Sequence, residues 1–403
     1  MSCRKNRKYT SISSMVIINT NIESISNYPF DRLRNLLGTS KINKDLVSID
    51  FSIGQPYQKV PEFIRETILN SFEKWHLYPP LGGISELKNA YLEWTKRRFK
   101  LPYSLSEENI LPLAGTKEGL FSIALALAYD NIVIPNPFYQ VYLAPSIIKK
   151  VNICYLDISE KFEYLYDLEE LSKLVSSKKS LVYFCSPSNP NGKSASYSYL
   201  DKLIKIIRNS GSFLLIDECY VDLYNSIEPV GALKVSCDSA EKLNNILVFH
   251  SLSKRSNVAG LRSGFVSGDK RVISLFRKLR TYSAPTIPIP LQLASASLWS
   301  DDLHVEQNRI LYKEKFEYAN NRLENYKHYK TTDAGFYLWL HVKDGEYFTK
   351  NLYEKYGIKV MPGKYLAYGS FNNPGENYIR IALVHDLNKC KFAIDKISEL
   401  LGV

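Results

Sequence analysis

The sequence predicts an α/β protein that has a large domain built around a mostly parallel sheet and a smaller α+β domain. Three observations support this prediction: the chain length, a repeated alternation of strand and helix patterns in the middle of the chain, and a change of pattern after about residue 300. A chain of 403 residues is too long for one small core, so two domains, or one large domain with an appendage, are expected.

The middle of the chain alternates short apolar runs with amphipathic helical patterns. The runs that begin with apolar or β-branched residues and end in polar or turn residues are 131–140, 180–190, 212–220, 245–254 and 261–268. Between them, the spacing predicts a helix over 198–211, with Leu200, Leu203, Ile206 and Ile207 on one face. Strand, helix and strand at this spacing predict parallel β-α-β units, whose polar residues gather beyond the carboxyl ends of the strands, where open α/β sheets bind ligands.

The C-terminal part follows a different pattern. Residues 304–326 are typical of a long amphipathic helix, and residues 335–342 and 377–384 of strands in a second, smaller layer. The segment before about residue 60 has no partner of its own, so we expect it to pack with this part. The expected domains are a small domain of residues 28–60 and 300–403 and a large domain of residues 61–299.

Residues 1–27 are expected to form a disordered extension. The stretch MSCRKNRKYTSISS is basic, rich in serine and free of acidic residues, a composition typical of organelle transit peptides. The apolar stretch MVII that follows is too short for a secretory signal. Three interpretations stay open: a true extension, a targeting segment, or a start of the natural chain at Met15.

The composition bounds the class of partner. The formal net charge is +11, which alone would admit a nucleic-acid or membrane-surface protein. Because the lysines are dispersed and no apolar run approaches the roughly 20 residues that span a bilayer, we expect no nucleic-acid partner and no membrane association. None of the six cysteines forms a Cys-x-x-Cys pair, which fits reduced thiols in the cytoplasm, and no metal site is expected.

The stretch HSLSKRSNVAGLRSG, residues 250–264, raises the question of covalent chemistry. An amine reacts with a carbonyl only when it is unprotonated, so a catalytic lysine needs a pKa that its surroundings lower. Lys254 follows an apolar run, and a strand end that faces a pocket with Arg262 nearby would provide such surroundings. Loop lysines are common, so Lys254 alone is not diagnostic.

Polar residues at other strand ends point to the same rim. Asp217 closes an apolar run, where a buried carboxylate is costly unless it meets a cation. It would either cap a helix or pair with an arginine, which are structural roles, or hold a proton on a heterocyclic nitrogen. Tyr220 would place a phenol beside it. Asn189 follows another apolar run in an Asn-Pro turn, a common motif with a purely structural explanation of its own.

Two stretches suggest anion binding. In LAGTKEGLFSIALAL, the backbone N–H groups of Gly115, Thr116 and Lys117 open a helix, where the helix dipole favours an anion. Ser251 and Arg262 would supply a hydroxyl and a bidentate fork to the same phosphate.

The second stretch is a strand pattern in which Arg380 lies among apolar residues. A buried guanidinium needs an anionic partner, which would be either a substrate carboxylate or an acidic side chain in a structural salt bridge. Together the two anion sites, the amine and the acid match what pyridoxal 5′-phosphate requires: an amine, an acid for the ring nitrogen, donors for the phenolic oxygen, a phosphate cradle and a carboxylate clamp.

The motifs S-x-S-K and G-x-R-x-G, in their order with the others over about residues 28 to 400, resemble class I/II aminotransferases of the fold-type I pyridoxal-phosphate enzymes. The resemblance implies that Lys254 holds the cofactor and moves the proton, and that Asp217 pairs with the ring nitrogen. It implies that Tyr220 and Asn189 contact the phenolic oxygen, the latter beside the substrate, and that Tyr139 stacks on the ring.

The same resemblance implies that Gly115, Thr116, Lys117, Ser251 and Arg262 cradle the phosphate. Tyr78 matches a tyrosine that reaches the phosphate of the neighbouring subunit, which implies a homodimer with shared active sites. Arg380 matches the clamp for the substrate α-carboxylate, and Gly54 matches a glycine near it.

Finer motifs such as YPPLGGISELKNAYLEW and IPNPFYQVYLAP resemble bacterial N-succinyldiaminopimelate aminotransferases of lysine biosynthesis. Asn191 and the stretch GGISEL depart from the usual pattern of that group, which puts the subfamily in doubt but not the reaction class. The implied substrates are an amino acid and a 2-oxo acid, with glutamate and 2-oxoglutarate as the expected pair. For distal carboxylates of a substrate, Lys59, Lys117 and Arg34 are candidates that the sequence does not rank.

Several alternatives share these motifs. Aspartate or another amino acid remains a possible substrate, and a pyridoxal-phosphate carbon–sulfur lyase would use the same cofactor contacts. A non-catalytic regulator with an aminotransferase-like domain would need a DNA-binding module, and the 27 residues before the first family match are too few for a winged helix.

Overall fold

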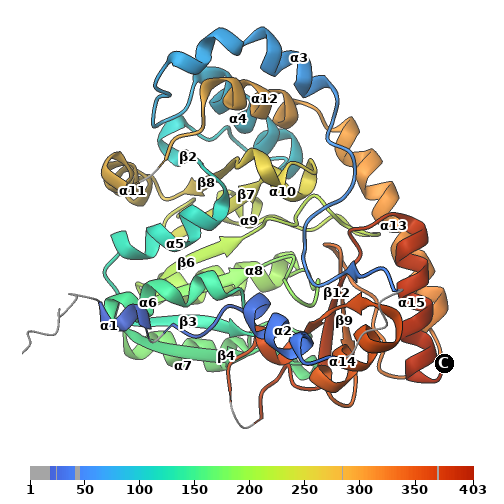
Figure 1. Ribbon diagram of the computed structural model, residues 1–403. Coiled ribbons are helices and arrows are strands. Elements are labelled where there is room, and N and C mark those ends of the chain that lie inside the picture. Colours follow the sequence, from blue (N-terminus) through green and yellow to red (C-terminus); the bar gives the residue numbers. More distant parts are fainter. Residues whose placement is uncertain (1–18, 24, 41–45, 284, 370–371) are drawn as a thin grey trace, which may run out of the picture.

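The computed structural model describes residues 19–23, 25–40, 46–283, 285–369 and 372–403 (Figure 1). The larger part of the molecule is built on a seven-stranded sheet with the order β2-β8-β7-β6-β5-β3-β4. Its strands are β2 (Ile110–Leu113), β3 (Asn131–Asn136), β4 (Asn152–Asp157), β5 (Ser180–Cys185), β6 (Phe213–Asp217), β7 (Ile246–Ser251) and β8 (Gly264–Gly268). The pairs from β4 to β7 are parallel, so the predicted α/β class with a mostly parallel sheet is confirmed.

One strand departs from the expected β-α-β units. β8 runs antiparallel to both β7 and β2. Between β7 and β8 the chain has only the short helix α10 (Leu252–Arg255) and one 3-10 turn, which are too short to cross back over the sheet. The tight return places Lys254 and Arg262 on one loop at the end of β7.

The strands of the large sheet are buried on both faces because helices cover both sides. Alternate residues enter two separate cores: Val248 and Ile216 pack on one face, and Leu247 and Leu215 on the other. The first face is covered by α4 (Ser85–Phe99), α7 (Leu168–Ser177), α8 (Tyr197–Asn209), α9 (Ala232–Asp238) and α12 (Ile289–Ser300). The second is covered by α5 (Thr116–Ala126), α6 (Ala144–Lys149) and α11 (Lys270–Ser283).

The predicted helix over 198–211 is confirmed as α8. Its buried stripe consists of Leu200, Leu203, Ile204 and Ile207. Ile206 is only half-buried, because the stripe that faces the sheet is centred one position away from it. Helix α3 (Phe63–Asn70) packs on α12 at the far end of the molecule, shown at the top of Figure 1.

The C-terminal part has its own core around a three-stranded antiparallel sheet, β11-β12-β9. The strands are β9 (Tyr337–His341), β11 (Met361–Pro362) and β12 (Tyr378–Ala382), and the helices are α13 (Leu303–Leu323), α14 (Gly345–Tyr356) and α15 (Leu387–Leu401). The long helix and the two strands expected in this part are therefore present.

The N-terminal segment joins this C-terminal part. Strand β1 (Ile49–Asp50) pairs in parallel with β10 (Ile358–Lys359), and α2 (Pro29–Gly38) packs against α14 (Figure 1). These contacts support the division that we propose, with residues 28–60 and 300–403 in a small domain and residues 61–299 in a large one.

Most of the extension expected at residues 1–27, including Met15, lies outside the described residues; α1 (Thr20–Glu23) is the helix that the structure gives within it. Within the part of the chain that is described, no helix combines the length and apolar character needed to cross a bilayer.

Candidate active site

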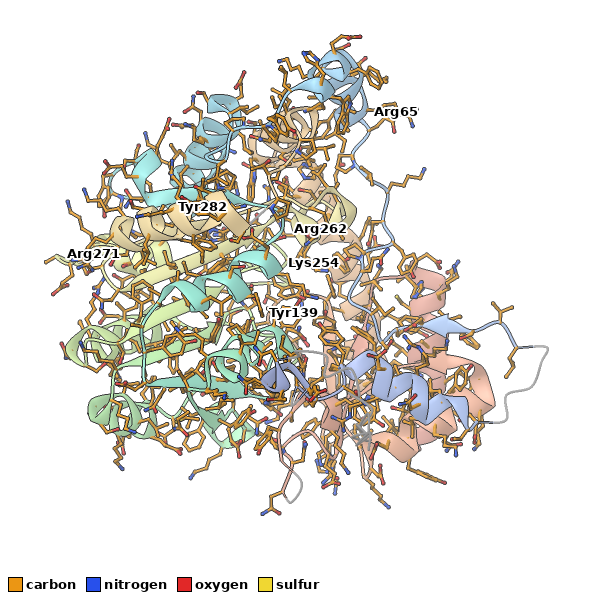
Figure 2. All side chains as sticks on the ribbon, turned by 60° about the vertical axis from the view of Figure 1, so that its left-hand side comes forward. Arg65, Tyr139, Lys254, Arg262, Arg271 and Tyr282 are labelled. Carbon is orange, nitrogen blue, oxygen red and sulfur yellow. The ribbon has the colours of Figure 1, made fainter. Side chains whose placement is uncertain are left out.

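A cavity of about 310 Å³ opens beyond the carboxyl ends of β5, β6 and β7, where the large sheet meets the C-terminal part. Figure 2 shows Lys254, Arg262 and Tyr139 together in this region. The predicted site residues that line the cavity are Gly54, Thr116, Lys117, Tyr139, Asn189, Asp217, Tyr220, Ser251, Lys254, Arg262 and Arg380. They come from segments that are far apart in the sequence, as expected for the rim of an α/β sheet.

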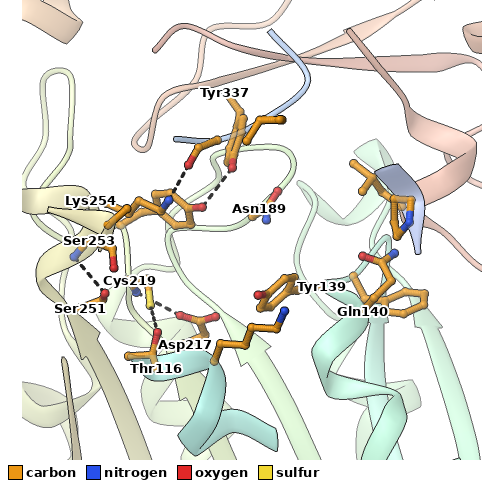
Figure 3. Close-up of a pocket in the computed structure, with 18 of the residues that line it drawn as sticks. Thr116, Tyr139, Gln140, Asn189, Asp217, Cys219, Ser251, Ser253, Lys254 and Tyr337 are labelled. Carbon is orange, nitrogen blue, oxygen red and sulfur yellow. Dashed lines mark hydrogen bonds between the residues drawn. The ribbon is translucent and has the colours of Figure 1, made fainter. Parts of the chain in front are cut away.

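Lys254 lies on α10, directly after β7, and its amine enters the cavity (Figure 3). Its Nζ donates a hydrogen bond of 2.5 Å to the carbonyl oxygen of Gly54. Burial lowers the pKa of Lys254 to about 8, and the positive charges of Arg380 and Arg262 act in the same direction. At pH 7 about one lysine in ten is then unprotonated, against about one in three thousand at an ordinary pKa near 10.5. The lowered pKa is what the sequence-based prediction of a reactive amine at Lys254 requires.

Asp217 ends β6 and is buried at the floor of the cavity. One carboxylate oxygen accepts a hydrogen bond of 2.8 Å from the Tyr142 hydroxyl, and the other accepts one of 3.1 Å from the backbone N–H of Cys219. Burial raises the pKa of Asp217, and these hydrogen bonds oppose the shift. Among the residues that the structure describes, no arginine or lysine forms an ion pair with it, so the carboxylate is free to pair with a cation of a ligand.

The N-terminus of α5 forms the base of an anion site. Gly115 precedes the helix with φ of +87°, a conformation that favours glycine, and a Cβ there would lie 2.1 Å from an Nη atom of Arg262. The Arg262 guanidinium therefore lies against the first turn of α5. Ser251 faces the same cavity, where its hydroxyl caps α10 by accepting from Ser253 N–H at 3.1 Å. Free helix N–H groups, the helix dipole and a guanidinium fit a phosphate group.

Arg380 lies in the middle of β12 and is buried at the opposite wall of the cavity. Its Nη atoms donate to the Asn189 side-chain oxygen at 2.8 Å and to the Ser52 carbonyl at 2.7 Å. Its Nε is buried without a partner. Because both acceptors are neutral, Arg380 is not used in a structural salt bridge within the described chain, and it keeps a positive charge for an anionic ligand.

Aromatic side chains form the rest of the wall. Tyr139 lines the cavity next to the 3-10 turn Gln140–Tyr142, and burial raises its pKa strongly, so its phenol stays neutral. Tyr220 is also buried, and its hydroxyl lies 3.2 Å from that of Tyr337. Tyr78 does not line the cavity and is fully exposed; its expected role concerns a neighbouring subunit and stays a prediction.

The cavity-lining residues that sequence reasoning missed include Tyr28, Tyr142, Cys219 and Tyr337. The Cys219 thiol lies 3.1 Å from the Thr116 hydroxyl, between the anion site and Asp217 (Figure 3). Tyr142 follows Tyr139 by one turn of the chain, so the spacing in NPFYQVY was a usable signal. Tyr337 comes from β9, and no local pattern indicated that its side chain enters the cavity.

The residues present fit pyridoxal 5′-phosphate. The cavity has a lysine with a lowered pKa, a buried carboxylate without a cation, and a cationic anion site opened by a glycine. Arg380, which has no acidic partner in the described chain, adds a cation for a substrate carboxylate.

The chain was compared with known proteins. The family model described as "Aminotransferase class I and II" matches residues 47–397. The LL-diaminopimelate aminotransferase of Natranaerobius thermophilus is 31% identical over 361 residues, which cover 87% of this chain and 91% of that protein.

Solved structures of aminotransferases share the fold of this chain. An aminotransferase from Neisseria meningitidis superposes with a TM-score of 0.90 and 35% identity, covering 95% of this chain and all of that one. Aminotransferase AspB from Helicobacter pylori gives a TM-score of 0.87 and 31% identity, covering 94% of this chain and 99% of that one.

Proposed function

Because the chain belongs to the class I and II aminotransferases, enzymes that use pyridoxal 5′-phosphate, we propose that it moves an amino group from an amino acid with a distal carboxylate to a 2-oxo acid. Glutamate and 2-oxoglutarate are the proposed second pair. The observation that carries the proposal is the arrangement of Lys254, Asp217 and Arg380 around one cavity.

The proposed substrate is a diaminopimelate, either N-succinylated, as the sequence motifs indicate, or free, as in the name of the relative from Natranaerobius thermophilus. Lys117 supports a distal carboxylate because its side chain lines the cavity, with Nζ 5.4 Å from the Tyr28 ring centre. In the described part of the chain Lys117 has no acidic partner, since Glu118 beside it pairs with Arg280. Its charge is therefore available to a substrate.

The other two cations that the sequence offered are less suitable. Arg34 is exposed and pairs with Asp31 at 2.9 Å. Lys59 lines a different cavity, together with His304 and His385. Neither lines the cavity that contains Lys254. Lys117 is therefore the residue that we assign to the distal group.

When bound, the cofactor supplies a carbon that joins the amino nitrogen of the substrate and a ring that withdraws electrons from it. Arg380 binds the α-carboxylate and orients the substrate so that its Cα–H bond points toward Lys254. The Lys254 amine would remove the proton from Cα as a base and, as an acid, deliver it to the carbon that the cofactor supplies. Its lowered pKa of about 8 suits both roles near neutral pH.

The remaining residues hold charge in place. Asp217 keeps a proton on the ring nitrogen because its buried carboxylate favours a cation beside it. Tyr220 and Asn189 donate toward the phenolic oxygen, and Tyr139 covers the ring. Gly115, Thr116, Ser251, Arg262 and the backbone N–H of Lys117 anchor the phosphate. These roles follow the family pattern, and they are supported by the fact that all of these residues except Gly115 line the cavity.

We further propose a homodimer in the cytoplasm. A second cavity of about 480 Å³ adjoins the anion site, lined in part by Arg262, Lys117, Ile25 and Phe121. The apolar wall of this second cavity would contact the ring of a tyrosine, and its cations lie where the tyrosine hydroxyl would approach the cofactor phosphate. The fully exposed Tyr78 of the partner subunit would enter it and complete the anion site.

The test is a screen of single amino acids with the purified, cofactor-loaded protein. Each is added without a 2-oxo acid, and loss of the visible absorption of the lysine-bound cofactor reports amino transfer. We expect a rapid loss with N-succinyl-LL-diaminopimelate or LL-diaminopimelate, with aspartate and alanine as comparisons. If neither diaminopimelate removes the absorption while aspartate does, the proposed substrate is wrong. Release of pyruvate and ammonia from cystathionine would instead indicate a lyase.

A further inference from the structure

Two phenols from different parts of the chain meet at the wall of the active-site cavity. Tyr220 follows β6 of the large sheet, and Tyr337 begins β9 of the small sheet. Both side chains are buried and line the cavity, and their hydroxyl oxygens lie 3.2 Å apart, the contact that Figure 3 marks beside Tyr337. Either hydroxyl can donate in this pair, so the direction of the hydrogen bond has to be argued.

A count of protons shows what each direction of this hydrogen bond would leave for a ligand. Each neutral phenol has one proton to donate, and burial raises the pKa of Tyr220 well above its ordinary value, so this phenol stays neutral. If Tyr220 donated to Tyr337, it would have no proton left for a ligand in the cavity. If Tyr337 donates, the Tyr220 oxygen accepts and its own proton is free to point into the cavity.

The surroundings of Tyr337 favour its role as the donor. The guanidinium carbon of Arg380 lies 4.4 Å from the centre of the Tyr337 ring. A cation over an aromatic ring draws electron density from it, which makes the phenol a stronger hydrogen-bond donor. The Tyr337 hydroxyl fits at this position because residue 54 is a glycine: a Cβ at Gly54 would lie 1.9 Å from the Tyr337 oxygen and clash with it.

We propose that Tyr337 is a positioning residue: its hydroxyl donates to the Tyr220 oxygen and thereby directs the Tyr220 proton to the phenolic oxygen of the bound cofactor. This inference rests on the proposed function. It links the substrate clamp to the cofactor, because one aromatic ring contacts Arg380 and its hydroxyl contacts Tyr220.

The experiment is a pH titration of the visible absorption of the loaded protein, which reports the protonation of the bond between Lys254 and the cofactor. A donor at the phenolic oxygen stabilises negative charge there and so weakens proton binding at that bond. We expect Tyr337→Phe to raise the midpoint by about half a pH unit, since one net hydrogen bond corresponds to at most about one unit. Tyr220→Phe should raise it further.

Two further variants separate positioning from packing. In the double variant Tyr220→Phe, Tyr337→Phe, the midpoint should equal that of Tyr220→Phe alone, because Tyr337 acts through Tyr220. Tyr312→Phe is the matched control: Tyr312 is a buried tyrosine of the same apolar cluster, and its hydroxyl donates instead to Gln58 at 3.1 Å. It should leave the midpoint unchanged.

An unchanged midpoint in Tyr337→Phe, a shift in the double variant beyond that of Tyr220→Phe, or an equal shift in Tyr312→Phe would each overturn the inference. If the unaltered protein shows no visible absorption with the cofactor, the proposed function itself fails. The two failures are therefore distinguishable. Thermal unfolding of each cofactor-free variant, compared with that of Tyr312→Phe, checks that the fold is intact.

Discussion

The hydroxyl of Tyr142 donates a hydrogen bond of 2.8 Å to the carboxylate of Asp217, and both groups are buried. The Tyr142 ring is stacked on that of Tyr183, at 4.5 Å between ring centres. The hydrogen bond favours the ionised carboxylate, whereas burial disfavours it. Tyr142 therefore helps to keep Asp217 ionised, as the role that we propose for Asp217 beside the cofactor ring requires.

Tyr142→Phe is expected to lower kcat about fivefold, because one net hydrogen bond to the carboxylate is worth about 1 kcal/mol. KM for the amino acid should change little, since the Tyr142 hydroxyl bonds to Asp217 and not to Arg380, whose partners are Asn189 and Ser52. Steady-state kinetics measure both constants. Tyr183→Phe is the matched control, because its hydroxyl donates to the Leu120 carbonyl at 2.6 Å and not to Asp217. Equal losses in the two variants would contradict an electrostatic role.

Asp217→Asn is expected to stabilise the cofactor-free protein while lowering kcat about a hundredfold or more. Burial raises the folded-state pKa of Asp217, so the stability that this group contributes is present below the unfolded pKa and is lost as pH rises through the folded pKa. Asp217→Asn has no carboxyl group to ionise, so its stability does not fall in this way as pH rises.

Thermal unfolding of the cofactor-free proteins from pH 4 to pH 8 measures this effect. The advantage of Asp217→Asn in Tm should grow as pH rises and reach roughly 2 °C, the shift expected for about 1 kcal/mol. An advantage that shrinks with rising pH would show that the carboxylate is not penalised by burial.

Lys117→Ala is expected to raise KM about fivefold for substrates with a distal carboxylate, because a partly exposed ion pair is worth up to about 1 kcal/mol. KM for alanine, which lacks a distal carboxylate, should stay the same. Lys59→Ala is the control, since Lys59 lines another cavity. The assignment of Lys117 is wrong if KM rises equally for both kinds of substrate.

His250→Ala is expected to lower the free energy of unfolding by about 3 kcal/mol, because it leaves a buried cavity and removes one hydrogen-bond partner each from Glu218 and Tyr91. The His250 ring nitrogens lie 2.9 Å from Glu218 and 2.7 Å from the Tyr91 hydroxyl, and all three side chains are buried. Lys205→Ala, which breaks an exposed pair with Asp201, should change the stability by less than about 0.5 kcal/mol. Denaturant unfolding compares them, and a loss below 1 kcal/mol in His250→Ala would contradict the expectation.

Much of the site could be predicted because its residues follow apolar runs that become neighbouring parallel strands. Asp217 ends β6 and Lys254 follows β7, and these two strands are paired, so the proximity of the two residues results from the sheet topology. The Gly115 turn was visible as small residues before a helix. The family motifs then supplied the roles that geometry alone does not assign.

The rest could not be predicted from local patterns. The antiparallel direction of β8 results from a loop too short for a crossover, whereas the strand pattern of its residues fits either direction. Tyr337 lies in an apolar strand pattern, so the sequence alone does not distinguish it from the core residues of β9. The ranking of Lys117 over Lys59 needed the tertiary structure, because it depends on which cavity each side chain enters. The site of Tyr78 depends on a second copy of the chain.

The most direct test of the central claim is the identification of the lysine that binds the cofactor. The loaded protein is reduced with borohydride, digested, and analysed by mass spectrometry, with Lys254→Ala as the control. We predict that the phosphopyridoxyl group is found on Lys254 alone and that the control shows neither the group nor visible absorption. A stably modified lysine elsewhere, or an unchanged absorption in Lys254→Ala, would contradict the account.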